Sequence, residues 1–138
     1  MSSIRRQVNI AATPRVVWNA FTSVDGWTSW YADEARCDAR VGGRLVLVAD
    51  YDDDDNPIEE AGVFHKLRPT SKLEIAFDRC PTPMSGARLA IQLARDGDET
   101  RVSMVLSKAE ALSDAEQREE LDATWRRAFA ALQSALDA

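Results

Sequence analysis

The stretch SDAEQREELDATWRRAFAALQSAL, residues 113–136, decides the fold because its pattern predicts one long amphipathic helix. Ser113 and Glu116 have the spacing of a capping box, in which two side chains satisfy free backbone N–H groups at a helix start. At about 1.5 Å per residue this helix would be about 35 Å long, enough to cross a sheet of six or seven strands. Its apolar stripe recurs every three or four residues and comprises Leu121, Trp125, Phe129, Leu132 and Leu136.

Residues 34–107, which precede this helix, contain short segments in which apolar and polar residues alternate. Turn-forming residues separate the segments, as in an antiparallel meander. The clearest hairpin connection is DGDE at residues 96–99, where glycine can take a positive φ. The expected strands are residues 34–39, 44–51, 59–67, 72–77, 87–95 and 100–107.

The N-terminal part of the chain predicts a strand followed by helical structure. Apolar residues within 4–10 indicate a short opening strand. Thr13 suits the N-cap of the next helix, and Pro14 suits its first position because proline has no N–H to satisfy. We expect this helix to break at residues 25–26, Asp-Gly, and an aromatic helical turn to follow at residues 27–31.

Composition excludes several classes of protein. The chain has 138 residues, 45% of them hydrophobic and 29% charged, so one domain spanning residues 1–138 is expected. A net charge of −6 would repel phosphate backbones, which disfavours nucleic-acid binding. No apolar run approaches the roughly 20 residues that cross a bilayer, so we expect no membrane insertion. Cys37 and Cys80 lack the spacing of zinc or redox sites and are interpreted as free thiols of a cytoplasmic protein.

The order of these elements predicts an α+β domain in which a curved antiparallel sheet wraps the terminal helix. Where strands curl around a single helix, the centre is often wider than side chains can fill. A cavity between the helix and the sheet is therefore expected, and cavities of this kind take small molecules.

A series of motifs along the chain resembles a known family. The motifs are TPxxVWxAFT at 13–22, WxxWY at 27–31, VGGR at 41–44, GV through LxPxxxL at 62–73, and the terminal helix containing Trp125. Together they resemble the START-like superfamily and, within it, the activator of heat-shock-protein-90 ATPase homology family. The resemblance implies a helix-grip fold, with about seven antiparallel strands around the C-terminal helix and two short helices after the first strand. Relatives carry lipids, bind plant hormones, cyclise polyketides or assist chaperones, so the fold does not select a function.

The predicted pocket is mainly aromatic and apolar, as small-molecule sites usually are. Trp30, Tyr31 and Trp125 are the strongest candidates, because a Trp N–H or Tyr O–H needs a partner and favours the border between a cavity and solvent. Any single aromatic residue at helical or strand spacing can equally be plain core. The predicted lining comprises Phe21, Trp27, Trp30, Tyr31, Leu47, Val63, His65, Ile75, Phe77, Trp125 and Phe129.

His65 is the only histidine of the chain and the first polar candidate for the pocket. Strict alternation places it on the same strand face as Val63 and Leu67, pointing inward. There it could donate to a ligand or act as a general base, or it could be a half-buried histidine bonded to backbone. If Phe64 faces inward instead, His65 faces solvent.

We expect no catalytic residue, no metal and no cofactor. The acidic run at residues 52–55 lacks the glycine and the final glutamate of a calcium loop and is interpreted as a hairpin tip. No Gly-x-Ser-x-Gly elbow is present, and one histidine and two separated cysteines offer too few metal ligands.

The sequence therefore favours non-catalytic binding of a small hydrophobic or amphipathic molecule between the sheet and the C-terminal helix. A cyclase or dehydratase type of enzyme using the same pocket is the first alternative, and it needs a polar pair inside the cavity. A chaperone-type protein-interaction module is the second alternative. A homodimer or another protein partner stays open.

Overall fold

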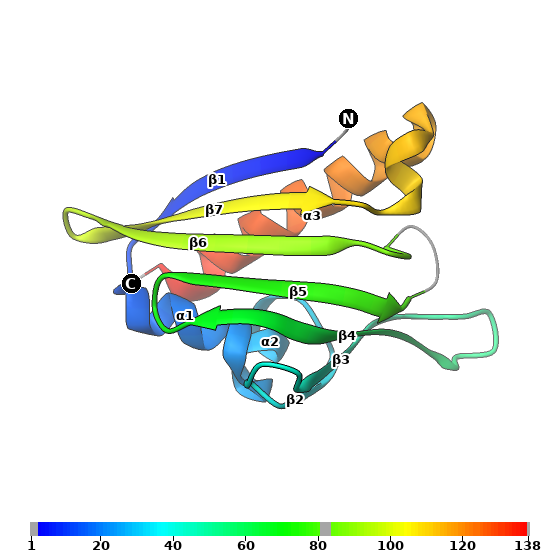
Figure 1. Ribbon diagram of the computed structural model, residues 1–138, viewed down its shortest axis with the longest axis horizontal. Helices are drawn as coiled ribbons and strands as arrows, with labels where there is room; N and C mark the ends of the chain where they lie inside the picture. The colour runs from blue at the N-terminus through cyan, green and yellow to red at the C-terminus, as the bar shows by residue number, and fades with distance from the viewer. Residues whose placement is uncertain (1–2, 81–83, 138) are drawn as a thin grey trace.

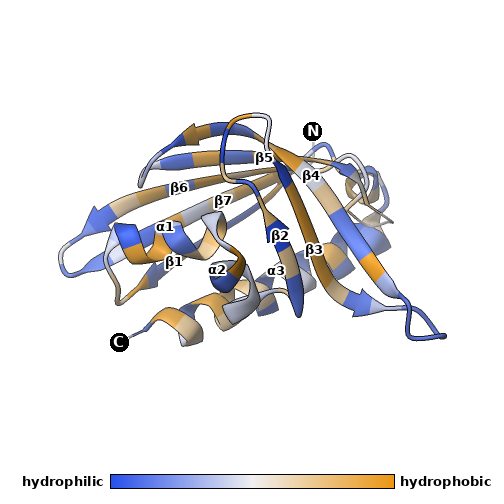
Figure 2. Cartoon of the chain, turned by 90° about the horizontal axis from the view of Figure 1, so that it is seen from below, coloured by the Kyte–Doolittle hydropathy of each residue, from blue (hydrophilic) through white to orange (hydrophobic). Residues whose placement is uncertain are grey.

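A curled antiparallel sheet and one long helix make up most of the structure, a computed structural model that describes residues 3–80 and 84–137 (Figure 1). The seven strands lie in the order β1-β7-β6-β5-β4-β3-β2, so β1 and β2 form the two edges. The three α-helices of the described residues lie on one side of the sheet (Figure 2). The elements are β1 (Ile4–Ile10), α1 (Pro14–Thr22), α2 (Val24–Trp30), β2 (Glu34–Cys37), β3 (Arg44–Tyr51), β4 (Pro57–Arg68), β5 (Lys72–Arg79), β6 (Arg88–Asp96), β7 (Glu99–Ser107), η1 (Glu110–Ser113) and α3 (Ala115–Leu136).

This architecture confirms the predicted helix-grip fold. Every expected strand is present, and β3 has the predicted bounds at both ends. The apolar stripe of α3 faces the sheet, where Leu121, Trp125, Phe129 and Leu132 are all at most 3% exposed. Leu136 is only partly buried because it lies in the last turn.

Two helix boundaries differ from the prediction. The break between α1 and α2 lies at Ser23, whose hydroxyl accepts from the backbone N–H of Gly26 at 2.8 Å and so caps α2. Gly26 is thus inside a helix, and a Cβ there would lie 2.0 Å from the Asn19 carbonyl oxygen, so glycine allows α2 to pack closely on α1. Asp114, not Ser113, is the N-cap of α3, because the Ser113 hydroxyl donates to the Glu110 carbonyl within the preceding 3-10 turn.

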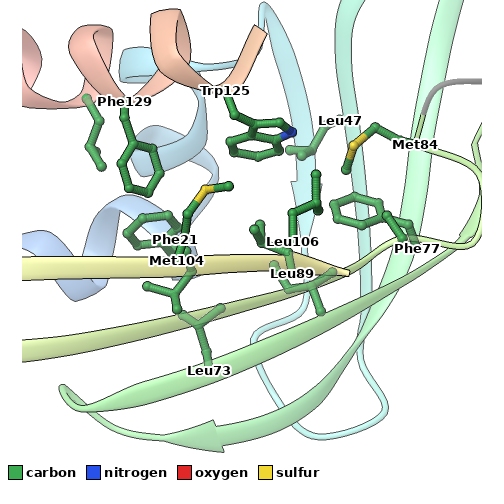
Figure 3. Close-up of a cluster of buried hydrophobic side chains, with 14 of the residues drawn as sticks. Phe21, Leu47, Leu73, Phe77, Met84, Leu89, Met104, Leu106, Trp125 and Phe129 are labelled. Atoms are coloured by element: carbon green, nitrogen blue, oxygen red, sulfur yellow. The ribbon is translucent and has the colours of Figure 1, made fainter. Parts of the chain in front are cut away.

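The core lies between α3 and the concave face of the sheet, and side chains fill it (Figure 3). Phe129 and Trp125 descend from α3 toward residues of β5, β6 and β7, and Phe21 of α1 lies beside them. The indole N–H groups of α2 are satisfied by the backbone of α1: Trp27 donates to Phe21 at 2.8 Å and Trp30 to Ala20 at 3.0 Å. The two short helices are therefore joined to each other by both packing and hydrogen bonds.

The prediction that His65 points inward is wrong. The register of β4 against β5 shifts between Phe64 and Lys66, which leaves His65 as an extra residue in a β-bulge. Phe64 pairs with Ile75 and is fully buried, whereas His65 is exposed. Val63, adjacent to Phe64, is only half-buried and lies on the opposite face of the strand from it. The prediction failed because it took Val63, His65 and Leu67 to share one inward face. The bulge places Leu67, which pairs with the buried Leu73, on the core side, whereas Val63 and His65 lie outside it.

The facing of β4 can be tested by a matched pair of substitutions. Phe64→Ala removes a fully buried ring and should cost about 3–5 kcal/mol of unfolding free energy. His65→Ala changes an exposed side chain and should stay within about 0.5 kcal/mol of the parent chain. Urea denaturation of the two variants would measure both values, and a larger loss for His65→Ala would contradict the observed register.

Candidate functional site

A cleft of about 550 Å³ lies between α3 and the adjoining ends of β3 and β4, beside the end of α2. The sheet supplies Ala49, Asp50, Ile58 and Glu60, Trp30 and Tyr31 come from the end of α2, and Met84 precedes β6. The helix wall consists of Leu121, Thr124, Trp125, Arg127, Ala128 and Ala131.

The cleft exists because small side chains meet where the sheet diverges from the helix. Thr124, Ala128 and Ala131 recur along one side of α3 and leave room that larger residues would occupy. On the opposite wall, a register shift between Val48 and Asp50 makes Ala49 an extra residue in β3. Asp50 then pairs with Ile58, and both side chains line the cleft.

The structure divides the predicted pocket residues into three groups. Trp30, Tyr31 and Trp125 line the cleft. Val63 and His65 do not line it, since they lie on the outer side of β4 or in its bulge. The remaining residues belong to the hydrophobic core and do not line this cleft, so their placement in the pocket is corrected: Phe21, Trp27, Leu47, Ile75, Phe77 and Phe129.

Sequence reasoning missed Glu60, the more buried of the two carboxylates of the cleft wall. The phenolic O–H of Tyr31 donates to Glu60 Oε1 at 2.6 Å. Burial raises the pKa of Glu60 above its ordinary value, the nearby charge of Asp50 raises it further, and the hydrogen bond from Tyr31 opposes both effects. Glu60 directly follows Glu59, and only the register of β4 shows which of the two faces the helix.

Tyr31 is held in place by aromatic neighbours. Its ring stacks on Trp125 with centroids 5.4 Å apart and an interplanar angle of 17°, and it meets Trp27 edge-on at 5.8 Å. Burial, followed by the charge of Glu60, keeps the pKa of Tyr31 well above its ordinary value. The phenol therefore stays protonated at neutral pH and acts as a fixed donor to Glu60.

Trp125 carries an unusual polar atom. Its Nε1 is buried, and among the described residues no acceptor reaches it. Most buried Trp N–H groups have a partner, as those of Trp27 and Trp30 do. Trp125 therefore contributes mainly apolar surface to the cleft.

The cysteines offer no nucleophile. Cys80 lies near Glu60, and burial together with that carboxylate raises its pKa to about 12. Burial likewise raises the pKa of Cys37 to about 11. Both thiols are free and stay protonated at neutral pH, whereas a reactive cysteine requires a lowered pKa.

Within the part of the chain that the structure describes, no group of three or more His, Cys, Asp or Glu side chains has the geometry to hold a metal ion. The acidic run forms the tip of the β3–β4 hairpin, where Asp52 Oδ1 accepts from the backbone N–H groups of Asp54 and Asn56, each at 2.9 Å. None of the described helices has the length and apolar character needed to cross a membrane.

A family model described as "Activator of Hsp90 ATPase homolog 1-like protein" matches residues 11–137. The chain belongs to this family. This family is part of the START-like superfamily, as the motif series predicted. A comparison with curated proteins gave no match.

Solved structures share the fold at low sequence identity. The Aha1 dimer from Colwellia psychrerythraea is 19% identical with a TM-score of 0.80, and the alignment covers 99% of this chain and 97% of that one. Protein CV1439 from Chromobacterium violaceum is 20% identical with a TM-score of 0.78 and coverage of 99% and 97%. CalU16 from Micromonospora echinospora is 19% identical with a TM-score of 0.76, covering 97% of this chain and 75% of CalU16. At these identities the likeness concerns the fold of the AHSA1-like family and not a ligand.

The cost of burying the Glu60 carboxylate can be measured. Because burial raises its pKa, the folded chain holds this proton more tightly than the unfolded chain does, so ionisation at higher pH lowers stability. Glu60→Gln removes that cost, and its amide oxygen can still accept from Tyr31. At neutral pH we expect the variant to have a higher unfolding free energy than the parent chain, by about 1.4 kcal/mol for each pH unit by which folding raises the pKa of Glu60. At about pH 4, close to the pKa of a glutamate in the unfolded chain, we expect no gain.

Glu59→Gln is the matched control, since Glu59 is exposed on the same strand. Guanidinium denaturation at both pH values compares the two variants with the parent chain. A gain for Glu60→Gln that is the same at acidic and neutral pH would show that the carboxylate is not the cause.

Proposed function

We propose that the cleft binds a small amphipathic molecule, with its apolar part against α3 and its polar part toward Glu60. The observation that carries the proposal is the lining itself. Leu121, Trp125 and Ile58 supply apolar surface, and the Tyr31–Glu60 pair supplies one fixed polar position. This combination is typical of small-molecule sites, and the cleft volume falls in their usual range.

Binding without catalysis is the simplest use of this site. A cyclase or dehydratase needs groups that both take up and release protons near the substrate. Glu60 is the one observation that favours this alternative, because a buried carboxylate with a raised pKa can transfer a proton. If the parent chain converts a bound molecule, and the Glu60→Gln variant still binds that molecule but no longer converts it, the protein is an enzyme that uses Glu60.

A chaperone-type interaction surface has weaker support. The described chain has four exposed large hydrophobic residues, and they come from separate segments: Val16, Val24, Val41 and Tyr51. Docking surfaces are instead contiguous apolar patches of several hundred Å².

We also retain a cytoplasmic location of the protein as a prediction, which is consistent with the free thiols of its two cysteines.

A homodimer of this chain could form through an edge strand of the sheet or through the short aromatic segment. The aromatic segment at residues 27–31 is an unsuitable interface, because Trp27 and Trp30 are buried within the protomer. Edge strands β1 and β2 remain, and the Colwellia protein of similar fold is a dimer. If an edge pairs two copies, sedimentation equilibrium should give twice the 15.3 kDa chain mass, and a proline at Gln7 or Ala35 should return the monomer. A monomer at all concentrations would exclude the dimer.

The binding proposal predicts that filling the cleft abolishes uptake of an apolar probe. N-phenyl-1-naphthylamine is uncharged at neutral pH and fluoresces in apolar surroundings, so we expect saturable binding to the parent chain. Ala128→Trp places an indole in the cleft, where it takes the space of the probe. The probe then loses apolar contacts with the cleft that contribute about 1–2 kcal/mol, so its binding should weaken about tenfold or more. Ala131→Trp, at an exposed position of the same wall, should do the same without disturbing the core.

Ala130→Trp is the matched control, because Ala130 is exposed and does not line the cleft. It adds the same indole to the same helix and should leave binding unchanged. Thermal unfolding followed by circular dichroism checks that all three variants fold. Equal probe binding by Ala131→Trp and Ala130→Trp would refute the cleft as the site.

A further inference from the structure

The polar groups of the cleft are unequally distributed between its two walls. Glu60 and Asp50 lie on the sheet, and Arg127 lies on the helix. Two carboxylates and one guanidinium leave the cleft with a formal charge of −1 when all are ionised. No ion pair involves any of these three side chains among the residues that the structure describes.

Glu60 offers an unused acceptor. Within the described chain only Tyr31 donates to this carboxylate, and it does so to Oε1. Oε2 has no donor among the described residues, and Glu60 lines the cleft, so this oxygen can accept from a ligand bound there. A carboxylate oxygen in partly desolvated surroundings prefers a charged donor, because charge-assisted hydrogen bonds are about twice as strong as neutral ones.

Asp50 places a second negative charge within reach of Glu60. The bulge at Ala49 brings Asp50 onto the cleft wall, and its charge contributes to the raised pKa of Glu60. A cation in the cleft would relieve this repulsion, whereas an anion would add a third negative charge beside it. Arg127 attracts anions, but Arg127 and Asp50 are both exposed, so solvent screens these two charges more strongly than the charge of the less exposed Glu60. The net preference of the cleft is therefore set by Glu60.

We propose that the cleft selects organic amines, whose ammonium group is held by Glu60 and Asp50 while an apolar chain or ring packs against Leu121 and Trp125. The selection rests on the binding function proposed above and names its ligand class. The ring of Tyr31, which is hydrogen-bonded to Glu60, and that of Trp30, 5.4 Å from it between centroids, add to the attraction, because aromatic rings favour a nearby cation.

Three ligands with one apolar chain and different head groups test this selection: octylamine, octanol and octanoate. Each is used at neutral pH and low salt to displace N-phenyl-1-naphthylamine from the parent chain. We expect octylamine to bind at least about tenfold more tightly than octanol, in keeping with a charge-assisted hydrogen bond, and octanoate to bind most weakly.

Glu60→Gln should bring octylamine to within about twofold of octanol, because the amide keeps the shape of the site and removes its charge. Asp50→Asn should reduce the preference for octylamine by a smaller factor. Glu59→Gln, exposed and absent from the cleft lining, should retain the full preference.

The outcomes separate the two proposals. If octanoate binds most tightly, or if Glu60→Gln leaves the preference for octylamine intact, the amine selection is wrong and the cleft remains a binding site. Equal affinity for all three ligands would likewise overturn the selection alone. If neither the probe nor any of the three ligands binds, the selection and the proposed function both fail.

Discussion

The structure depends on burying one apolar stripe, that of α3. A helix of 22 residues with large side chains on a single face is stable only if that face is covered. One sheet can cover it only by curling, and a seven-stranded sheet that curls this far needs places where the strands bend. The register shifts of β3 and β4 provide those places. At one of them Gly62 is required, since a Cβ there would lie 2.5 Å from the Ala76 carbonyl oxygen.

The same bulges determine which side chains reach the cleft. An extra residue in a strand turns the following side chain to the other face, so curvature and site composition are linked. In β3 the bulge brings Asp50 to the inner wall. In β4 the bulge at His65 allows Phe64 and Leu67, three residues apart, both to face the core, and it leaves His65 exposed. The acidic character of the cleft is in this sense a consequence of how the sheet bends.

Sequence reasoning succeeded where an element has a long, regular period. The helix over residues 115–136 and the strand at residues 44–51 were predicted nearly to the residue, because many positions support each assignment. It failed where one residue changes the phase, as at His65, and where the answer depends on side-chain volumes. Whether the space beneath α3 is filled depends on Thr124, Ala128 and Ala131 relative to the strands opposite, which one-dimensional periodicity does not show.

The aromatic residues illustrate why only part of the site could be predicted. Aromatic content alone does not distinguish a ligand wall from a scaffold, and this chain uses its aromatics for both. Trp27 is fully buried, and its indole N–H donates to the Phe21 carbonyl near the end of α1, so its role is to hold α2 against α1. Tyr31 follows directly on α2 and is clamped against Trp125, which orients its O–H toward Glu60. A carboxylate is costly to bury without a fixed donor. The buried rings of Trp27 and Trp125 therefore contribute to the site indirectly. They hold the Tyr31 phenol in the position from which it donates to Glu60 on the cleft wall.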